Sequence, residues 1–191
     1  MTKHPLEEKF NATAKDILDA IEKGFRSQVD VKGKLAELFL HRRLERLREA
    51  GKIDSLVWND KDDKPDFEVG LGGRTVRIEC KNVRSNEEGR FRKGEKAGWF
   101  KVEIQKTRGG TDRATGKQTR SYRTDQFDVL AACLFNQTHA WDYLFSAVSD
   151  LETRPESRDL LAVFQAVPPT AKGNWFPEPI AAIERVGRRR R

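Results

Sequence analysis

The chain has 191 residues, of which 35% are charged and 37% are hydrophobic, and its net charge at pH 7 is +7. That length suits one domain with an adequate core, so we expect a single domain over residues 1–191, and the basic balance favours a polyanionic partner such as nucleic acid. No signal segment is visible at the N-terminus, and the longest apolar run, residues 129–135, is too short to cross a bilayer. We therefore expect a cytoplasmic protein that does not enter a membrane.

Two helices are predicted in the first third of the chain. Residues 12–24 carry apolar side chains at helical spacing, and residues 33–50 carry a leucine stripe that ends before Gly51, a C-cap candidate. The stripe consists of Leu40, Leu44 and Leu47. Glu37 lies at the edge of that stripe, where a carboxylate needs a partner or a metal ion. The alternative is an ordinary helix-surface pair with a nearby Lys or Arg.

The sheet is predicted to begin at residues 56–58 and to continue as a hairpin over residues 65–81. Gly72 and Gly73 both accept positive φ, which favours a two-residue hairpin loop between two short strands. Side chains alternate along a strand, so one face is apolar and the other is polar. The apolar face comprises Phe67, Val69, Val76, Ile78 and Cys80, and the polar face comprises Asp66, Glu68, Arg77, Glu79 and Lys81.

The polar face of this hairpin carries the strongest chemical signal. The register places Asp66 opposite Glu79, with β-carbons ~5 Å apart, and two carboxylates at that distance repel each other. A divalent cation between them removes the repulsion, and Lys81 adds an ammonium group beside the same place. Glu68 and Arg77, which are also opposite each other, are predicted to form a cross-strand ion pair.

The remaining elements alternate between polar segments and apolar strands. Residues 82–98 are predicted to leave the sheet as a surface excursion, residues 99–105 to form a strand ending at Gln105, and residues 106–124 to form a long polar loop. Three further strands are expected at residues 127–135, 141–148 and 160–167, with a helix as the alternative for residues 141–148. Cys80 and Cys133 are expected to be buried free thiols.

Pro65-Asp66, followed by Glu79-Cys80-Lys81, resembles the PD-(D/E)XK motif of the restriction-endonuclease-like nuclease superfamily. The resemblance covers roughly residues 30–135, and it implies an α/β fold with a mixed central sheet flanked by helices. The implied catalytic core is residues 30–150, with residues 187–191 as a basic tail. The implied metal ligands are Asp66, Glu79 and the Cys80 carbonyl, with Glu37 as a further candidate, and Lys81 would orient the attacking water, bind the scissile phosphate, or both. Gln105 is either an accessory residue of the site or an ordinary polar residue at a strand end.

A basic surface for nucleic acid is predicted in the segment that follows Gln105. Lys and Arg side chains bind phosphates without reading sequence, and Arg also reads guanine in the major groove. The candidates are Lys106, Arg108, Lys117, Arg120 and Arg123. Tyr122 lies among them and is predicted to stack or pack. The alternative is a solvated charged loop.

The resemblance implies a Mg²⁺-dependent endonuclease that hydrolyses double-stranded DNA, with Mn²⁺ as a substitute metal. Within the superfamily we favour a small restriction-type enzyme acting as a homodimer, associated with DNA in a prokaryotic cytoplasm. The alternatives are a structure-specific, repair or mobile-element nuclease of the same superfamily, or a DNA-binding protein that does not cleave. No P-loop or dinucleotide fingerprint is present, so we expect no nucleotide cofactor.

Overall fold

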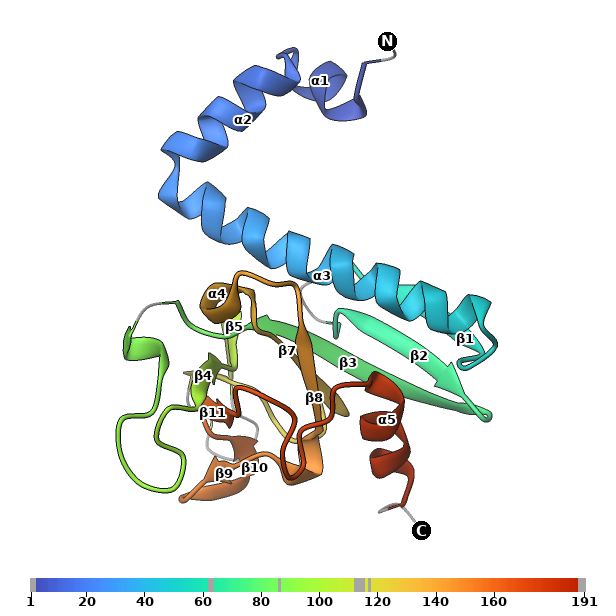
Figure 1. Ribbon diagram of the computed structural model, residues 1–191, viewed down its shortest axis with the longest axis vertical. Coiled ribbons are helices and arrows are strands. Elements are labelled where there is room, and N and C mark those ends of the chain that lie inside the picture. Colours follow the sequence, from blue (N-terminus) through green and yellow to red (C-terminus); the bar gives the residue numbers. More distant parts are fainter. Residues whose placement is uncertain (1–2, 62–63, 86, 112–115, 117, 189–191) are drawn as a thin grey trace. The chain divides into compact units, whose positions relative to one another are not determined.

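The computed structural model describes residues 3–61, 64–85, 87–111, 116 and 118–188 (Figure 1). The chain divides into two compact units, Met1–Leu35 and Ala36–Arg191. The second unit holds the sheet and every residue of the predicted hairpin. The prediction of one domain over the whole chain stays a prediction.

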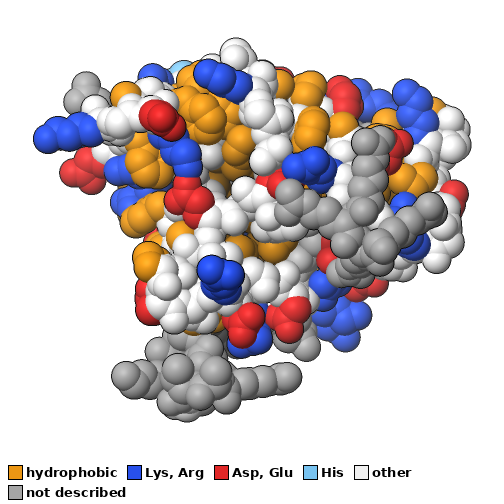
Figure 2. Space-filling view, turned by 90° about the horizontal axis from the view of Figure 1, so that it is seen from below, with side chains coloured by type: hydrophobic (Ala, Val, Ile, Leu, Met, Phe, Trp, Pro, Cys, Tyr) orange, Lys and Arg blue, Asp and Glu red, His pale blue; other side chains and the backbone are white. Residues whose placement is uncertain are grey.

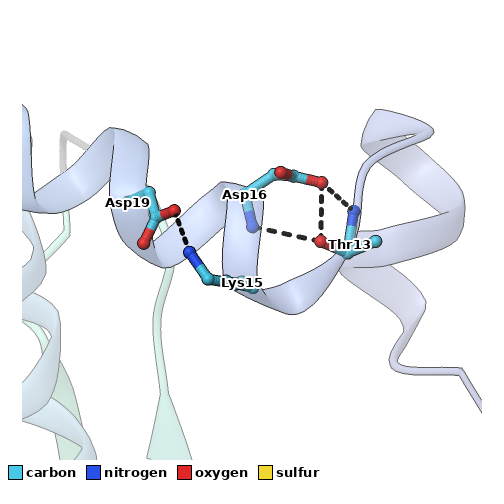
Figure 3. Close-up of polar contacts among 4 residues, drawn as sticks. All are labelled: Thr13, Lys15, Asp16 and Asp19. Carbon is cyan, nitrogen blue, oxygen red and sulfur yellow. Dashed lines mark hydrogen bonds and ion pairs between the residues drawn. The ribbon is translucent and has the colours of Figure 1, made fainter.

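The first unit is helical, with α1 at Pro5–Phe10, α2 at Ala14–Lys23 and the start of α3, whose bounds are Phe25–Glu49. Thr13 begins α2 with a capping box (Figure 3). Its hydroxyl accepts a hydrogen bond of 3.1 Å from the Asp16 N–H, and its own N–H donates one of 3.0 Å to Asp16 Oδ2. Lys15 and Asp19, one turn apart, form an exposed ion pair at 2.5 Å. These local contacts account for the predicted helix over residues 12–24.

The second unit is built on a five-stranded mixed sheet in the order β1-β2-β3-β7-β8 (Figure 1). The strands are β1 at Ser55–Trp58, β2 at Phe67–Leu71, β3 at Arg74–Asn82, β7 at Val129–Cys133 and β8 at Tyr143–Ala147. β3 and β7 are parallel, and the other neighbours are antiparallel. This arrangement confirms the predicted α/β fold with a mixed central sheet flanked by helices.

Two apolar cores lie on the two faces of this sheet. The first joins the sheet to α3 from Ala36 onward and to α5, at Pro179–Arg188, and it contains Phe67 and Ile78, both 0% exposed. The second contains Val83, Leu130 and residues from strands outside the main sheet. Because side chains alternate along β3, Glu79 points away from the face that α3 covers.

The predicted hairpin is confirmed in register and in turn geometry. Phe67 pairs with Ile78 and Leu71 with Arg74, and Gly72 and Gly73 both have positive φ, 58° and 73°. The predicted Glu68–Arg77 ion pair is wrong. Arg77 instead binds Asp128, which is 7% exposed and is contacted twice by the guanidinium, at 3.0 and 3.1 Å.

The strands predicted at residues 127–135 and 141–148 are confirmed as β7 and β8. Both thiols, Cys80 and Cys133, are free and buried. A short helix, α4 at Phe135–Thr138, and the 3₁₀ turn η2 at Val148–Asp150 flank β8.

Three predictions outside the main sheet differ from the structure. The strand expected at residues 99–105 ends at Glu103, and Gln105 begins the next strand. The single strand expected at residues 160–167 is two strands, β10 at Ser157–Leu161, paired with β9 at Thr153–Arg154, and β11 at Phe164–Val167, paired with β4 at Phe100–Glu103. The long loop expected at residues 106–124 contains an antiparallel ribbon of β5, Gln105–Thr111, and β6, Gln118–Ser121. Among the described residues, no helix is long and apolar enough to span a membrane.

Candidate active site

The β2–β3 hairpin positions the two predicted carboxylates. Asp66 lies directly before β2, and its Oδ2 accepts a hydrogen bond of 2.8 Å from the N–H of Cys80. The paired ladder begins one residue later, at Phe67 and Ile78. Asp66 is therefore held beside the stretch of β3 that carries Glu79 and Lys81, as the register predicts.

Glu79 is the most deeply buried acidic residue of this group, at 3% exposed. Its Oε1 accepts from two donors, the Lys81 ammonium at 2.7 Å and the Tyr122 hydroxyl at 2.6 Å. Both contacts meet the requirement that a buried charge be paired and hydrogen-bonded. The Lys81 ammonium also lies 5.8 Å from the centre of the Tyr122 ring.

The charges of this cluster act on one another. Burial, together with the charge of Glu79, raises the pKa of Asp66 to about 7, although the Lys81 ammonium opposes the rise. Burial alone would lower the pKa of Lys81, but the negative charges around it, first that of Glu79, raise it above its ordinary value. Lys81 is therefore a permanent cation at neutral pH, and Asp66 is a carboxylate held near the midpoint of its titration.

Tyr122 is the site residue whose role the sequence did not reveal. It follows β6 directly, its ring packs edge-on against Phe127 at 5.3 Å, and its carbonyl accepts from the Leu161 N–H at 2.9 Å. Burial, in the first place, raises the pKa of its hydroxyl, so the group stays protonated at neutral pH and can donate a hydrogen bond. No spacing within residues 106–124 indicates a partner 43 residues earlier in the chain.

Glu37, the further metal-ligand candidate, has a different environment. It extends from α3, which packs on the face of the sheet opposite to Glu79, and its Oε2 accepts from the Trp58 indole at 3.2 Å. Its negative charge still contributes to the raised pKa of Asp66. Its place among metal ligands stays a prediction, as does the part of Gln105, which starts β5 and pairs with Ser121 beside Tyr122.

The donor set suits a hard cation that keeps several waters. Among the described residues, no group of three or more His, Cys, Asp or Glu side chains is arranged to hold a metal ion. Asp66 and Glu79 would therefore act with a backbone carbonyl, such as that of Cys80, and with water or a substrate phosphate. Mg²⁺ binds in this manner, through one or two carboxylates plus phosphate oxygens.

The predicted basic surface is only partly described. Arg120 is exposed, and Arg123 lies 3.4 Å from Asp125 and 3.8 Å from Asp159, which offset its charge. Lys117 and the side chains of Lys106 and Arg108 lie outside the described residues. Figure 2 shows one face of the chain, on which Lys and Arg side chains are interspersed with acidic ones. Nucleic-acid binding by this segment stays a prediction.

A cavity of about 370 Å³ lies outside the group formed by Asp66, Glu79 and Lys81. Its lining includes Phe127, Asp128 and Arg158, and it contains none of the residues Asp66, Glu79 and Lys81. Asp128, the acidic residue of this lining, is bound by Arg77.

No protein-family model matches this chain, and no curated protein sequence matches it. Among solved structures, the chain is similar to a bacterial homing endonuclease, I-Ssp6803I, with 18% identity and a TM-score of 0.40, covering 68% of this chain and 82% of that one.

Proposed function

We propose that this protein is a metal-dependent endonuclease that hydrolyses the phosphodiester bonds of double-stranded DNA. The observation that carries the proposal is the placement of Asp66, Glu79 and Lys81 together at one end of the hairpin, with Glu79 only 3% exposed. Two carboxylates against one ammonium leave a negative charge that a divalent cation would neutralise. Glu37, whose charge also acts on Asp66, adds to this negative charge.

Each residue has a distinct part in the proposed reaction. Asp66 and Glu79 hold the cation, and a bound Mg²⁺ supplies charge neutralisation at the phosphate and a more acidic water. Lys81, cationic at neutral pH, binds a non-bridging oxygen of the scissile phosphate or orients the attacking water. Tyr122 keeps the Glu79 carboxylate in place through its hydrogen bond.

Double-stranded DNA is the proposed substrate because of the motif that Pro65-Asp66 and Glu79-Cys80-Lys81 resemble and because of the charge of the chain. The net charge of +7 favours a polyanionic substrate, and the paired acidic residues favour hydrolysis over simple binding. A restriction-type enzyme that cuts both strands would act as a homodimer on a symmetric site. Mg²⁺ is the proposed cofactor, and Mn²⁺ is the substitute.

One observation supports a second candidate function, that of a DNA-binding protein without nuclease activity. Oε1 of Glu79 already accepts from both Lys81 and Tyr122, so this carboxylate is satisfied without any cation. The cluster would then be a buried ion pair in a DNA-binding protein that does not cleave. The two candidates differ in whether Mg²⁺ is needed for a covalent change in the DNA.

The deciding experiment incubates the purified protein with long unmodified duplex DNA in Mg²⁺ and in EDTA. The comparison variants are Lys81→Ala and, as a control with the same change at an exposed lysine, Lys52→Ala. Discrete fragments that require Mg²⁺, persist with Lys52→Ala and vanish with Lys81→Ala are the expected result. Nicked or randomly cut DNA would support a nuclease that lacks sequence specificity. Intact DNA that shifts in a gel would support the DNA-binding protein that does not cleave.

A further inference from the structure

Val83 and Arg84, which directly follow β3, are fixed by backbone and side-chain contacts to other parts of the chain. Val83 bridges to Val102, the Arg84 N–H donates to the Lys101 carbonyl at 2.8 Å, and the Arg84 carbonyl accepts from the side chain of Gln137 at 2.8 Å. A β-carbon at Gly89 would lie 2.5 Å from that same carbonyl, so glycine is required there. These contacts fix Arg84 relative to β4.

Arg84 forms one wall of a pocket of about 270 Å³ that is lined mainly by charged groups. The other lining residues are Glu88, Arg92, Lys101 and Phe164. Three cations thus face one carboxylate. The excess of cations in this lining favours an anionic group as its occupant.

The positive charge of this pocket is only partly offset within the chain. The Arg84 guanidinium lies 5.6 Å from the centre of the Phe164 ring and 3.4 Å from Glu103. Phe164 is 37% exposed, so its ring orients the guanidinium at the surface. Within the part of the chain that the structure describes, neither Arg92 nor Lys101 belongs to an ion pair.

The pocket lies a short distance along the chain from the candidate active site. Arg84 follows Lys81 by three residues of extended backbone, which at ~3.3 Å per residue is about 10 Å. Successive phosphates on one DNA strand are separated by ~3.4 Å along the helix axis. A duplex whose scissile phosphate lies at Lys81 would therefore place other backbone phosphates of the same site within reach of the long Arg84 side chain.

We propose that Arg84, Arg92 and Lys101 form a subsite for a backbone phosphate of the nucleic acid whose scissile phosphate lies at Lys81. This assignment rests on the proposed function, because the DNA is the source of the anion. It adds a contact surface outside residues 106–124. The subsite contributes affinity and register without reading base sequence.

The test measures binding of a fluorescent duplex oligonucleotide in EDTA, over a range of salt concentrations, so that cleavage plays no part. The pocket variant is Arg92→Gln with Lys101→Gln. The matched control removes the same charge at two exposed lysines elsewhere, Lys52→Gln with Lys172→Gln. We expect the pocket variant to bind about fivefold to tenfold more weakly at low salt and to reduce the slope of log K against log salt by about 1. Equal affinities and slopes for the pocket and control variants would overturn the subsite.

A cleavage assay in Mg²⁺ on the same proteins separates failure of the subsite from failure of the proposed function. If the wild type cleaves DNA and the pocket variant binds like the control, the subsite is refuted and the nuclease function is supported. If the wild type binds DNA without cleaving it and the pocket variant binds more weakly than the control, the subsite is supported and the nuclease function is refuted. Absence of duplex binding by the wild type removes both.

Discussion

The hydroxyl of Tyr122 donates a hydrogen bond to Oε1 of Glu79, with 2.6 Å between the two oxygens. The bond joins the end of the β5–β6 ribbon to β3, the strand that carries the candidate active site. It also leaves Lys81 as the second donor to the same oxygen, at 2.7 Å. The orientation of this buried carboxylate is thus set by one group from its own strand and one from the ribbon.

Replacing Tyr122 with phenylalanine removes that donor and keeps the ring that packs on Phe127. A hydrogen bond to a charged group contributes about 1.5–3 kcal/mol, so we expect the free energy of unfolding to fall by about 2 kcal/mol and kcat for DNA cleavage to fall about tenfold. KM should change little, because Tyr122 acts on Glu79. Denaturant unfolding and steady-state cleavage kinetics measure these quantities.

Tyr143→Phe is the matched control for Tyr122→Phe. The Tyr143 hydroxyl donates to the Ala36 carbonyl at 2.7 Å, in the core on the face of the sheet opposite to Glu79. Its loss should lower stability and leave kcat per folded molecule unchanged. Equal effects of the two changes on kcat would mean that Tyr122 has a structural role only.

Lys81→Met removes the ammonium beside Glu79 and leaves a buried carboxylate that still accepts from the Tyr122 hydroxyl. Breaking a buried pair in this way costs about 3–5 kcal/mol, and we expect about 3 kcal/mol in EDTA because Tyr122 still donates. Saturating Mg²⁺ should restore part of that loss by binding the native state, while cleavage remains absent.

Thermal unfolding of Lys81→Met and of Lys52→Met, each in EDTA and in Mg²⁺, measures this effect. Lys52 is exposed, so its replacement should change stability by less than about 0.5 kcal/mol in either condition. A Lys81→Met protein that unfolds at the same temperature with and without the cation would argue against a metal site at Glu79.

The main sheet and the Asp66–Glu79–Lys81 group could be predicted because short-range features determine them. Gly72 and Gly73 set the turn, and alternation then assigns each side chain of the hairpin to one face. The register observed, Phe67 with Ile78 and Leu71 with Arg74, is the one that these two rules require. Asp66 and Glu79 meet as a consequence of that register.

Contacts that depend on tertiary packing could not be predicted in this way. The sequence favours Glu68 as the partner of Arg77, since they are opposite in the hairpin, but Asp128 approaches from 51 residues away and binds the guanidinium in a bidentate geometry. Tyr122 reaches Glu79 across 43 residues. The ribbon of β5 and β6 lacks an apolar alternation, and its register shift between Gln105 and Gly110 has no sequence signal.

Asp66 predicts a pH dependence of stability in the metal-free protein. Burial and the charge of Glu79 raise the pKa of Asp66 to about 7, so the folded protein holds this proton more tightly than the unfolded chain does. The resulting stabilisation is fully present below the unfolded pKa, near 4, and it is lost as the pH rises through about 7. We expect the wild type in EDTA to lose on the order of 2–4 kcal/mol over this window relative to Asp66→Asn.

Urea unfolding between pH 5 and pH 8 measures this difference. In Mg²⁺ the wild type should lose less stability at high pH than it does in EDTA, because the cation stabilises the ionised carboxylate, and Asp66→Asn should show no such rescue. Parallel pH profiles for the two proteins in EDTA would mean that Asp66 titrates near its ordinary value.

Asp128→Asn tests the ion pair that replaces the predicted one. Asp128 is 7% exposed and accepts from the backbone N–H of Arg77 at 2.9 Å as well as from its guanidinium. Glu68, within the described part of the chain, is instead bound by Asn59 at 3.2 Å and by Lys64 at 3.9 Å. Loss of the buried charge leaves Arg77 without its bidentate partner, so we expect a fall of about 2–4 kcal/mol in the free energy of unfolding. Glu68→Gln, the control at the predicted partner, should cost less than about 0.5 kcal/mol, as partly exposed pairs do. A larger loss from Glu68→Gln than from Asp128→Asn would restore the cross-strand pair as the dominant partner of Arg77.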